Sequence, residues 1–291
     1  MAQTSNAERT VPTRRISFED AVADLPKHFA VDGDLILSHL AASLSAVFPD
    51  GEDFFVRSVR HYRGKLTDPD LKRQVAGFIG QEATHGREHR MLNDRLDALG
   101  YPTKRFERWT KFALATRERL LPAISSLAAT AALEHFTATL AELLLTNEEA
   151  RNMFGDDALR DLFLWHALEE SEHKAVAYDV YQAVGGSQRL RRFTMNALLV
   201  GFIGGMALQV VISLLGDRDT YRRGKLRASW GRFKHSPLIS KDLLLQLRDF
   251  NRSDFHPDDR NSDALIEQWR AELFGDHGRL NDKLVGATSA A

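Results

Sequence analysis

Two glutamate–histidine pairs are the residues of this sequence best suited to bind metal. In each pair the histidine follows the glutamate by three positions: Glu82 precedes His85, and Glu170 precedes His173. Residues three apart lie on one face of a helix, about one turn from each other. A carboxylate and an imidazole at this spacing can bind neighbouring metal ions, so two such pairs on separate helices predict a two-metal centre.

Both pairs interrupt apolar stripes that repeat with helical spacing. A packed helix bundle needs apolar side chains at these positions, and an unpaired buried carboxylate destabilises a fold by several kcal/mol. The alternative to metal is a buried ion network, but neighbouring positions of the stripes carry no Lys or Arg. The apolar positions are Leu71, Val75, Phe78, Leu92, Leu96 and Leu99 around the first pair and Leu159, Phe163, Ala177, Val180 and Val184 around the second.

Such a centre also needs one glutamate from each of two further helices. Glu134 lies on an alanine-rich helix face, where a lone carboxylate is expected to be buried. Glu52 lies in line with Val56 and Val59, although a glutamate in a first helical turn can also be an ordinary residue favoured by the helix dipole.

Two extra histidines extend this set. His166 precedes Glu170 by four positions and is predicted as a seventh ligand, while His89 has the equivalent position on the earlier helix. We expect His89 to be an additional ligand or a hydrogen-bonding support of one. Glu169 is the alternative to its neighbour Glu170, but it lies off the stripe. The predicted metal ligands are Glu52, Glu82, His85, Glu134, His166, Glu170 and His173.

This ligand set resembles the di-metal carboxylate site of the ferritin-like superfamily. The motifs at residues 81–89, 166–174 and 255–257 resemble bacterial proteins catalogued as predicted metal-dependent hydrolases, and the resemblance extends over about residues 11–274. The His, Glu, His spacing that begins at His166 is similar to the arylamine N-oxygenase branch of the di-iron proteins. These resemblances imply a metal-dependent enzyme and leave its reaction open.

The chemistry of the ligands suits iron, with manganese as the alternative, because both metals accept carboxylate and imidazole donors. We expect two metal ions, Fe/Fe or Fe/Mn, that activate dioxygen on a small apolar or aromatic substrate, with an electron-donor protein as a partner. The first alternative is a two-metal hydrolase with a bridging hydroxide as nucleophile. The second is a metal-binding protein without catalysis. No catalytic residue is assigned beyond the metal ligands.

The elements that must position these residues are helices. Apolar residues recur with helical spacing, and alternating strand patterns are nearly absent. Asp68 before Pro69 is a helix start, and Gly100 is a stop. Helices are predicted over residues 34–63, with an interruption at 48–51, and over 68–99, 122–146 and 156–184, and the one long connection between them is in the middle.

This order predicts an all-α chain with a ferritin-like four-helix bundle and one crossover connection. A long apolar helix or helical hairpin and a short helical C-terminal region are expected to follow the bundle. The predicted divisions are a polar N-terminal segment at 1–30, the bundle at 31–188, the apolar segment at 189–216, and a basic linker with the C-terminal helices at 217–291.

The apolar stretch at residues 193–215 carries no charge and exceeds the roughly 20 residues that span a bilayer. It could span a membrane, form a hairpin that turns at Gly204 and Gly205, or be buried in the bundle or in a homo-oligomer. Basic residues flank both of its ends, a pattern compatible with two ends that face anionic lipid on the cytoplasmic side.

Composition excludes several other classes of protein. With 39 Lys and Arg against 40 Asp and Glu among 291 residues, the formal charge of −1 argues against binding to nucleic acid through bulk charge. The absence of cysteine excludes disulfides, iron–sulfur clusters and thiol catalysis. Residues 1–15 are polar and show no signal peptide. We therefore expect a cytoplasmic protein that acts on a small molecule, with the cytoplasmic face of the inner membrane as the alternative location.

Overall fold

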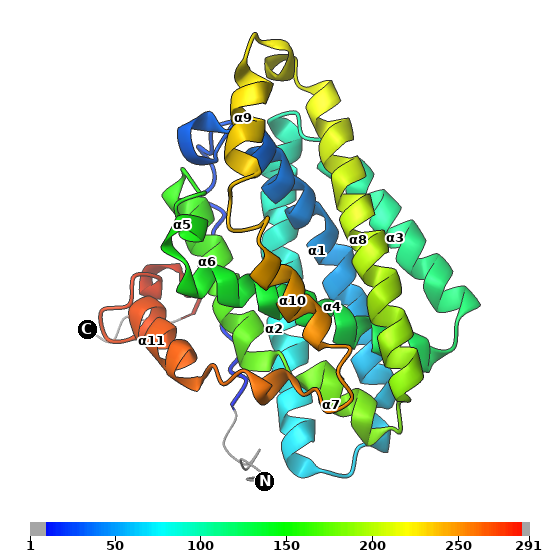
Figure 1. Ribbon diagram of the computed structural model, residues 1–291. Helices are drawn as coiled ribbons and strands as arrows, with labels where there is room; N and C mark the ends of the chain where they lie inside the picture. Colours follow the sequence, from blue (N-terminus) through cyan, green and yellow to red (C-terminus); the bar gives the residue numbers. More distant parts are fainter. Residues whose placement is uncertain (1–9, 287–291) are drawn as a thin grey trace.

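The computed structural model describes residues 10–286, and over this range the chain is all-α, as predicted. The described residues form no strand, only two isolated bridges, between Ile16 and Leu284 and between Ala30 and Phe154. Figure 1 shows the longest helices side by side, with the C-terminal helices against their outer faces.

Four helical stretches surround the predicted metal ligands. Helix α1 (Leu35–Tyr62) packs along α2 (Pro69–Ala98), and α4 (Ala123–Thr146) packs along α6 (Asp157–His173) and α7 (Val176–Ala183). Helix α1 also contacts α4, and α2 contacts α6 and α7. Asp34 and Asp68 cap the starts of α1 and α2, each by accepting a hydrogen bond from a first-turn backbone N–H.

The predicted interruption at residues 48–51 is wrong, because α1 continues through Pro49. Proline lacks the N–H that would bond to the carbonyl four residues earlier, which here belongs to Ser45. The side-chain amide of Asn93 on α2 donates to that carbonyl at 3.1 Å. A contact from the neighbouring helix thus replaces the lost hydrogen bond and keeps the helix intact.

The last of the four predicted helices is interrupted in the structure, although the sequence predicts it to be continuous. The sequence predicts one helix over residues 156–184, but α6 ends at His173 and α7 begins at Val176. At this turn the ammonium of Lys174 donates to the carbonyl of Arg260 and to the hydroxyl of Ser262. The C-terminal region is therefore attached to the bundle directly beside a predicted ligand.

Two further long helices cover one side of the bundle. The long connection predicted between the second and third helices forms α3 (Thr103–Leu120), which packs on α1. Helix α8 (Gln188–Gly216) packs on α4 and α1. Figure 1 shows both helices at the same edge of the molecule. Helix α8 continues through Gly204 and Gly205, so it is a single helix and the hairpin alternative is wrong.

Helix α8 is also the one helix among the described residues that is long and apolar enough to cross a membrane. Its most apolar 18-residue window has a mean hydropathy of 2.3, yet only 17% of that window is buried. Exposed apolar side chains therefore follow its outer face, at Phe193, Val200, Ile203, Leu208, Val211 and Leu215.

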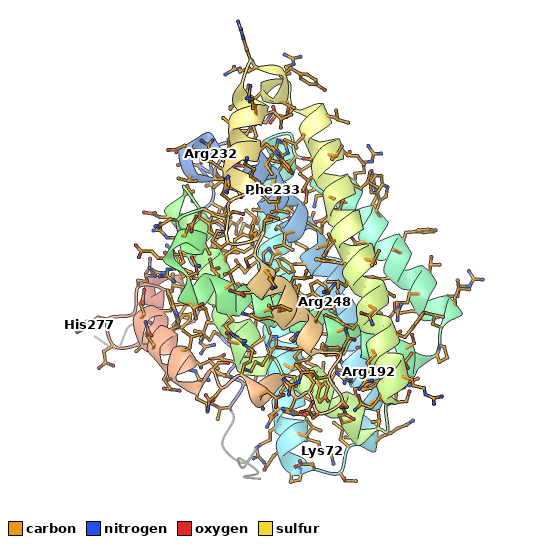
Figure 2. The ribbon with its side chains drawn as sticks, in the orientation of Figure 1. Lys72, Arg192, Arg232, Phe233, Arg248 and His277 are labelled. Carbon is orange, nitrogen blue, oxygen red and sulfur yellow. The ribbon has the colours of Figure 1, made fainter. Side chains whose placement is uncertain are left out.

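The N-terminal segment and the region after α8 both pack on the bundle. From Ile16 to Phe29 the N-terminal segment buries five large apolar side chains together with Trp165 of α6 and Trp269 of α11 (Asp263–Phe274). Arg232 of α9 (Lys225–Phe233) binds Asp34 at the start of α1 at 2.7 Å, and Figure 2 shows it beside Phe233. The remaining short elements are α5 (Glu148–Arg151), α10 (Lys241–Asp249) and 3₁₀ turns at Val31–Gly33, Arg63–Lys65, Arg218–Tyr221, Pro257–Asp259 and Asn281–Lys283.

Candidate metal centre

The seven predicted ligands come together in the interior of the bundle. Helix α1 supplies one of them, α2 two, α4 one and α6 three, and every one is at most 3% exposed. The spacing in the sequence explains why they face inward: residues three or four apart project from the same face of a helix, and here that face is turned toward the other three helices. The cluster consists of Glu52, Glu82, His85, Glu134, His166, Glu170 and His173.

The cluster divides into two neighbouring groups. One ligand atom from each of Glu52, His85 and His166 lies within 4.8 Å of the others, and the same holds for Glu82, Glu170 and His173. Two triads that each combine carboxylate and imidazole are consistent with two metal positions side by side.

Glu170 and Glu82 each lie between the two groups. Glu170 places Oε1 2.9 Å from Nε2 of His166 and Oε2 3.6 Å from Nε2 of His173. Glu82 places Oε2 3.9 Å from Nδ1 of His85 and Oε1 3.2 Å from Nε2 of His173. Each carboxylate therefore reaches both groups with separate oxygens, which suits a carboxylate shared by two metal ions.

Glu134 completes the second group, with Oε2 3.3 Å from Nε2 of His173. The first group contains Glu52, whose Oε1 is 3.7 Å from Nε2 of His166. Glu52 and Glu134 are thus placed at opposite groups, and Glu82 and Glu170 lie between them.

The polar atoms that face this space lack hydrogen-bond partners. They are both carboxylate oxygens of Glu52, Glu82 and Glu134, one oxygen of Glu170, Nδ1 of His85 and Nε2 of His173. Buried polar atoms in folded proteins are nearly always satisfied. When ionised, the four carboxyl groups would carry a charge that two divalent cations neutralise, so the donor set fits a pair of metal ions.

Burial and mutual repulsion hold protons on several of these carboxyl groups. Burial, with repulsion from Glu134, raises the pKa of Glu82 to about 8. Burial likewise raises the pKa of Glu134 to about 7, against the attraction of His173. The pKa of Glu52 is raised well above its ordinary value by burial and by its neighbours Glu82 and Glu170. A bound cation would stabilise the ionised carboxylates and so oppose these shifts.

Hydrogen bonds from outside the cluster orient the histidines. Nε2 of His85 is 3.0 Å from Oε2 of Glu169, which leaves Nδ1 facing the ligands. Nδ1 of His173 is 2.8 Å from the side-chain carbonyl of Gln81, which leaves Nε2 facing them. An outer acceptor that holds the proton of one ring nitrogen makes the other nitrogen available to a metal.

The third histidine, His166, is oriented by another histidine. Its Nδ1 is 2.7 Å from Nε2 of His89, and Nδ1 of His89 is 2.9 Å from the hydroxyl of Ser45. Both nitrogens of His89 are therefore engaged away from the centre. Of the two roles considered for His89, this geometry favours support of His166, and it likewise gives Glu169 a supporting position.

Arg14 is a part of this centre that sequence reasoning did not find. Its guanidinium donates to Glu169 at 2.9 Å and to Glu172 at 2.7 and 2.8 Å. Glu172 also accepts from Gln81 at 2.7 Å and from Arg270 at 2.6 Å. The cations missing from the apolar stripes thus come from outside the four helices, and they neutralise the outer carboxylates, not the inner ones.

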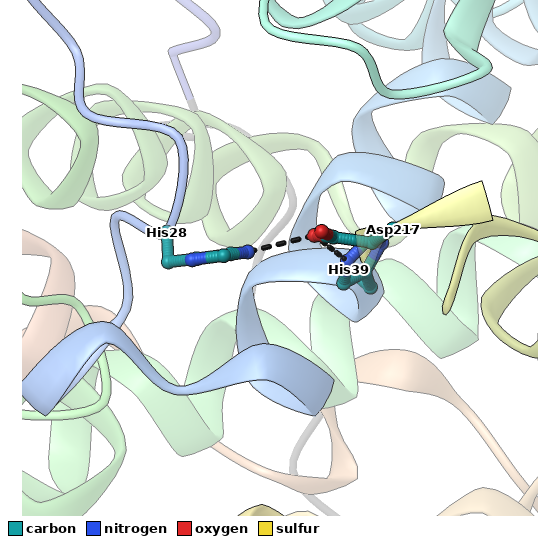
Figure 3. A group of neighbouring side chains, drawn as sticks. All are labelled: His28, His39 and Asp217. Carbon is teal, nitrogen blue, oxygen red and sulfur yellow. Dashed lines mark hydrogen bonds and ion pairs between the residues drawn. The ribbon is translucent and has the colours of Figure 1, made fainter. Parts of the chain in front are cut away.

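A second cluster, His28, His39 and Asp217, also brings three donor atoms within 4.8 Å (Figure 3). Oδ2 of Asp217 is 2.7 Å from Nε2 of His28 and 3.1 Å from Nε2 of His39, and Lys27 donates to Oδ1 at 3.1 Å. Although burial opposes ionisation, these bonds keep the pKa of Asp217 below its ordinary value. With its donors already bonded and a lysine beside it, this cluster attaches the end of α8 to α1 and lacks the features of a metal site.

Comparison with known proteins identifies a family for this chain. A family described as "predicted metal-dependent hydrolase" matches residues 12–261. No curated protein and no solved structure matches the chain at a significant level. The matched range contains all seven clustered residues and Arg14. The family description agrees with the hydrolase resemblance seen in the sequence, and it supports the hydrolytic alternative better than the dioxygen chemistry.

Proposed function

From the premise that this chain belongs to the predicted metal-dependent hydrolase family, we propose that it is a two-metal hydrolase. The observation that carries the proposal is the group of buried, unpartnered carboxylate and imidazole atoms of the metal centre. Two bound metal ions would lower the pKa of water and polarise the bond to be cleaved. We also propose that the four helices form a ferritin-like bundle.

The position of each residue determines whether it would bind one metal ion, bind both, or orient a ligand. Glu82 and Glu170 lie between the two groups and would bind both ions, Glu52, His85 and His166 would bind one, and Glu134 and His173 the other. Glu169, Gln81 and His89 hold the three imidazoles in the required orientation. The apolar side chains packed around the cluster exclude bulk water, which strengthens every electrostatic interaction inside.

The metal assignment is tested by elemental analysis of protein produced with iron, manganese and zinc all supplied. We expect two metal ions per chain and loss of most of them in His85→Ala and His173→Ala. His277→Ala is the matched control, because His277 is exposed at the edge of the molecule (Figure 2). Full metal content in the His85→Ala, His173→Ala double variant contradicts the assignment.

Dioxygen activation is the second candidate function, favoured by the number of carboxylates in the donor set and by iron and manganese as their usual metals. Anaerobic zinc- or manganese-loaded protein that hydrolyses a p-nitrophenyl ester supports the hydrolase. Rapid colour change of the anaerobic ferrous protein on mixing with dioxygen, together with no hydrolysis, supports the second candidate. An electron-donor protein belongs only to that candidate.

A further inference from the structure

A cavity adjoins the metal centre on the side of Glu52. It has a volume of about 340 Å³, which is within the range of small-molecule sites. Helices α1, α3, α4 and α8 form its walls, so it lies between the bundle and the two helices that cover one side of it. Its apolar lining includes Phe48, Phe55, Leu114, Phe136, Phe202 and Met206.

The carboxylate of Glu52 is the point at which the cavity and the metal centre meet. Glu52 lines the cavity, is 1% exposed, and has no hydrogen-bond partner for either oxygen. Phe48, also in the lining, packs with its ring centroid 4.7 Å from that of His166 and 4.6 Å from that of His89, with the rings tilted by 58° and 50°. The cavity therefore reaches Glu52, one member of the group that also contains His85 and His166.

The lining also restricts the charge of the occupant. None of the described residues that line the cavity is Lys, Arg or His, and its few polar groups include Thr110, Thr137 and Gln209 beside Glu52. Along this lining, away from the metal centre, an anionic group would find no compensating cation, and a strongly hydrated group would lose its water without replacement. A neutral molecule that is mostly hydrocarbon avoids both penalties.

We propose that this cavity binds the hydrocarbon chain of a neutral carboxylic ester and places its ester bond at Glu52; the inference rests on the two-metal hydrolase proposed above. In this reaction water supplies the hydroxyl to the acyl carbon, the bond between that carbon and the alcohol oxygen breaks, and the alcohol takes the remaining proton. The reaction needs no oxidant or reductant.

Helix α8 offers a matched pair of variants. Gly205 lines the cavity, whereas its neighbour Gly204 is exposed and does not. A Cβ added at either position meets no atom within 4 Å, and both glycines lie inside the helix, where a leucine raises helix propensity. Gly205→Leu therefore fills the cavity, and Gly204→Leu makes the same chemical change outside it.

The first experiment measures binding of 1-N-phenylnaphthylamine, a neutral apolar dye, to zinc-loaded protein by fluorescence. We expect Gly205→Leu to weaken binding by about tenfold, the loss that follows when roughly two methylene groups no longer fit. Gly204→Leu should bind as the parent chain does, and the metal content should be unchanged in both. Equal affinity in all three proteins, or equal loss in both variants, overturns the inference.

The second experiment measures hydrolysis of p-nitrophenyl esters of increasing acyl length. For the parent chain and Gly204→Leu, kcat/KM should rise with length, mainly through KM. For Gly205→Leu the rise should stop at short chains. Hydrolysis without length preference overturns the cavity inference and leaves the hydrolase, whereas dye binding without hydrolysis of any ester overturns the ester and the hydrolase and leaves the cavity as an apolar site.

Discussion

At the scale of single residues, the centre consists of an inner set that faces a common space and an outer set that orients it. The inner set was predictable, because each member replaces an apolar side chain at a regular helical position. The outer set was only partly predictable from the sequence. His89 and Glu169 were identified as neighbours, but Gln81 and Glu172 lie off the apolar stripes, and nothing in their spacing indicates that they face a histidine and an arginine.

The bond between His85 and Glu169 leads to the first prediction. Glu169→Gln keeps the shape of the side chain but removes the charge next to Nε2 of His85, so the imidazole becomes a weaker ligand. We expect metal affinity, measured by competition with a chelator, to fall by about 10- to 100-fold. Glu118→Gln removes a glutamate from a surface ion pair with Arg57 that contacts none of the seven ligands, and it should leave the affinity unchanged. Equal affinities in the two variants would refute an orienting role.

The raised pKa values predict how the stability of the metal-free protein depends on pH. Folding raises the pKa of Glu82 to about 8 and that of Glu134 to about 7, above their ordinary value of 4.5, so the folded chain keeps protons that the unfolded chain has released. Stability should therefore fall as pH rises from about 6.5 to 8, by about 1.4 kcal/mol per pH unit for each such proton, with the contribution of Glu134 ending near pH 7 and that of Glu82 near pH 8.

Although burial opposes it, Glu170 and Glu134 also raise the pKa of His173. This shift likewise makes stability fall as pH rises. The pKa of His85 is lowered by burial, and its contribution is confined to lower pH. Urea unfolding of chelator-treated protein checks the prediction, with the metal-loaded protein as the control. A metal-free protein whose stability is constant or rises over this range would show that the carboxyl groups are not held in the protonated form.

At the scale of elements, the helices were predictable where the chain carries local signals. Asp68 and Gly100 define α2 to within two residues, and the all-α class follows from the periodicity. The misplaced features depend on distant contacts: α1 passes through Pro49 because Asn93 satisfies a carbonyl, and the turn after α6 occurs where Lys174 meets the C-terminal region. Single-sequence periodicity contains no information on either contact.

The N-terminal segment leads to an element-scale prediction through Arg14. Its side chain is 12% exposed and is the cation that pairs with the fully buried Glu169. Arg14→Met should leave that carboxylate bonded to His85 but without a cation, and it should reduce the free energy of unfolding by about 3 kcal/mol. The measurement is urea unfolding of the metal-loaded protein.

A second substitution separates charge from packing. In the Arg14→Met background, Glu169→Gln removes the unpaired charge and should recover part of the loss, so the two effects should not add. Simple additivity would mean that the segment stabilises the fold only through its apolar side chains.

At the scale of the whole molecule, one face is unlike the rest. The outer side of α8 exposes large apolar side chains, among them Val200 at 76% and Leu208 at 57%. Phe112 of α3, which lies at the same edge of the molecule as α8 (Figure 1), is 75% exposed. Because α8 packs on α1 and α4, it cannot leave the bundle to span a bilayer without exposing their apolar contacts. We propose that this face contacts the surface of the cytoplasmic membrane, with basic residues after α8 adding attraction to anionic lipid.

The membrane proposal predicts that the protein sediments with membranes and resists a high-salt wash, because apolar burial is not screened by salt. Val200→Glu with Leu208→Glu should move it to the soluble fraction without loss of helix content. Lys72→Glu changes charge on an exposed position of α2 and should have no effect. A parent protein that is wholly soluble and monomeric without detergent contradicts this proposal and also the alternative of a homo-oligomer formed through α8.

The separation of Arg14 and Glu169 in the sequence affects when the metal centre can assemble during protein synthesis. The two residues are 155 positions apart, and a ribosome that adds about 5–20 residues per second needs about 8–30 s to pass from one to the other. During that interval Glu52, Glu82 and His85 are already synthesised, but their partners on α6 do not yet exist. Metal capture must therefore wait until the chain has emerged past His173, so nascent chains arrested before that point should remain metal-free, and the N-terminal segment closes over the centre only as the last of its ligands arrives.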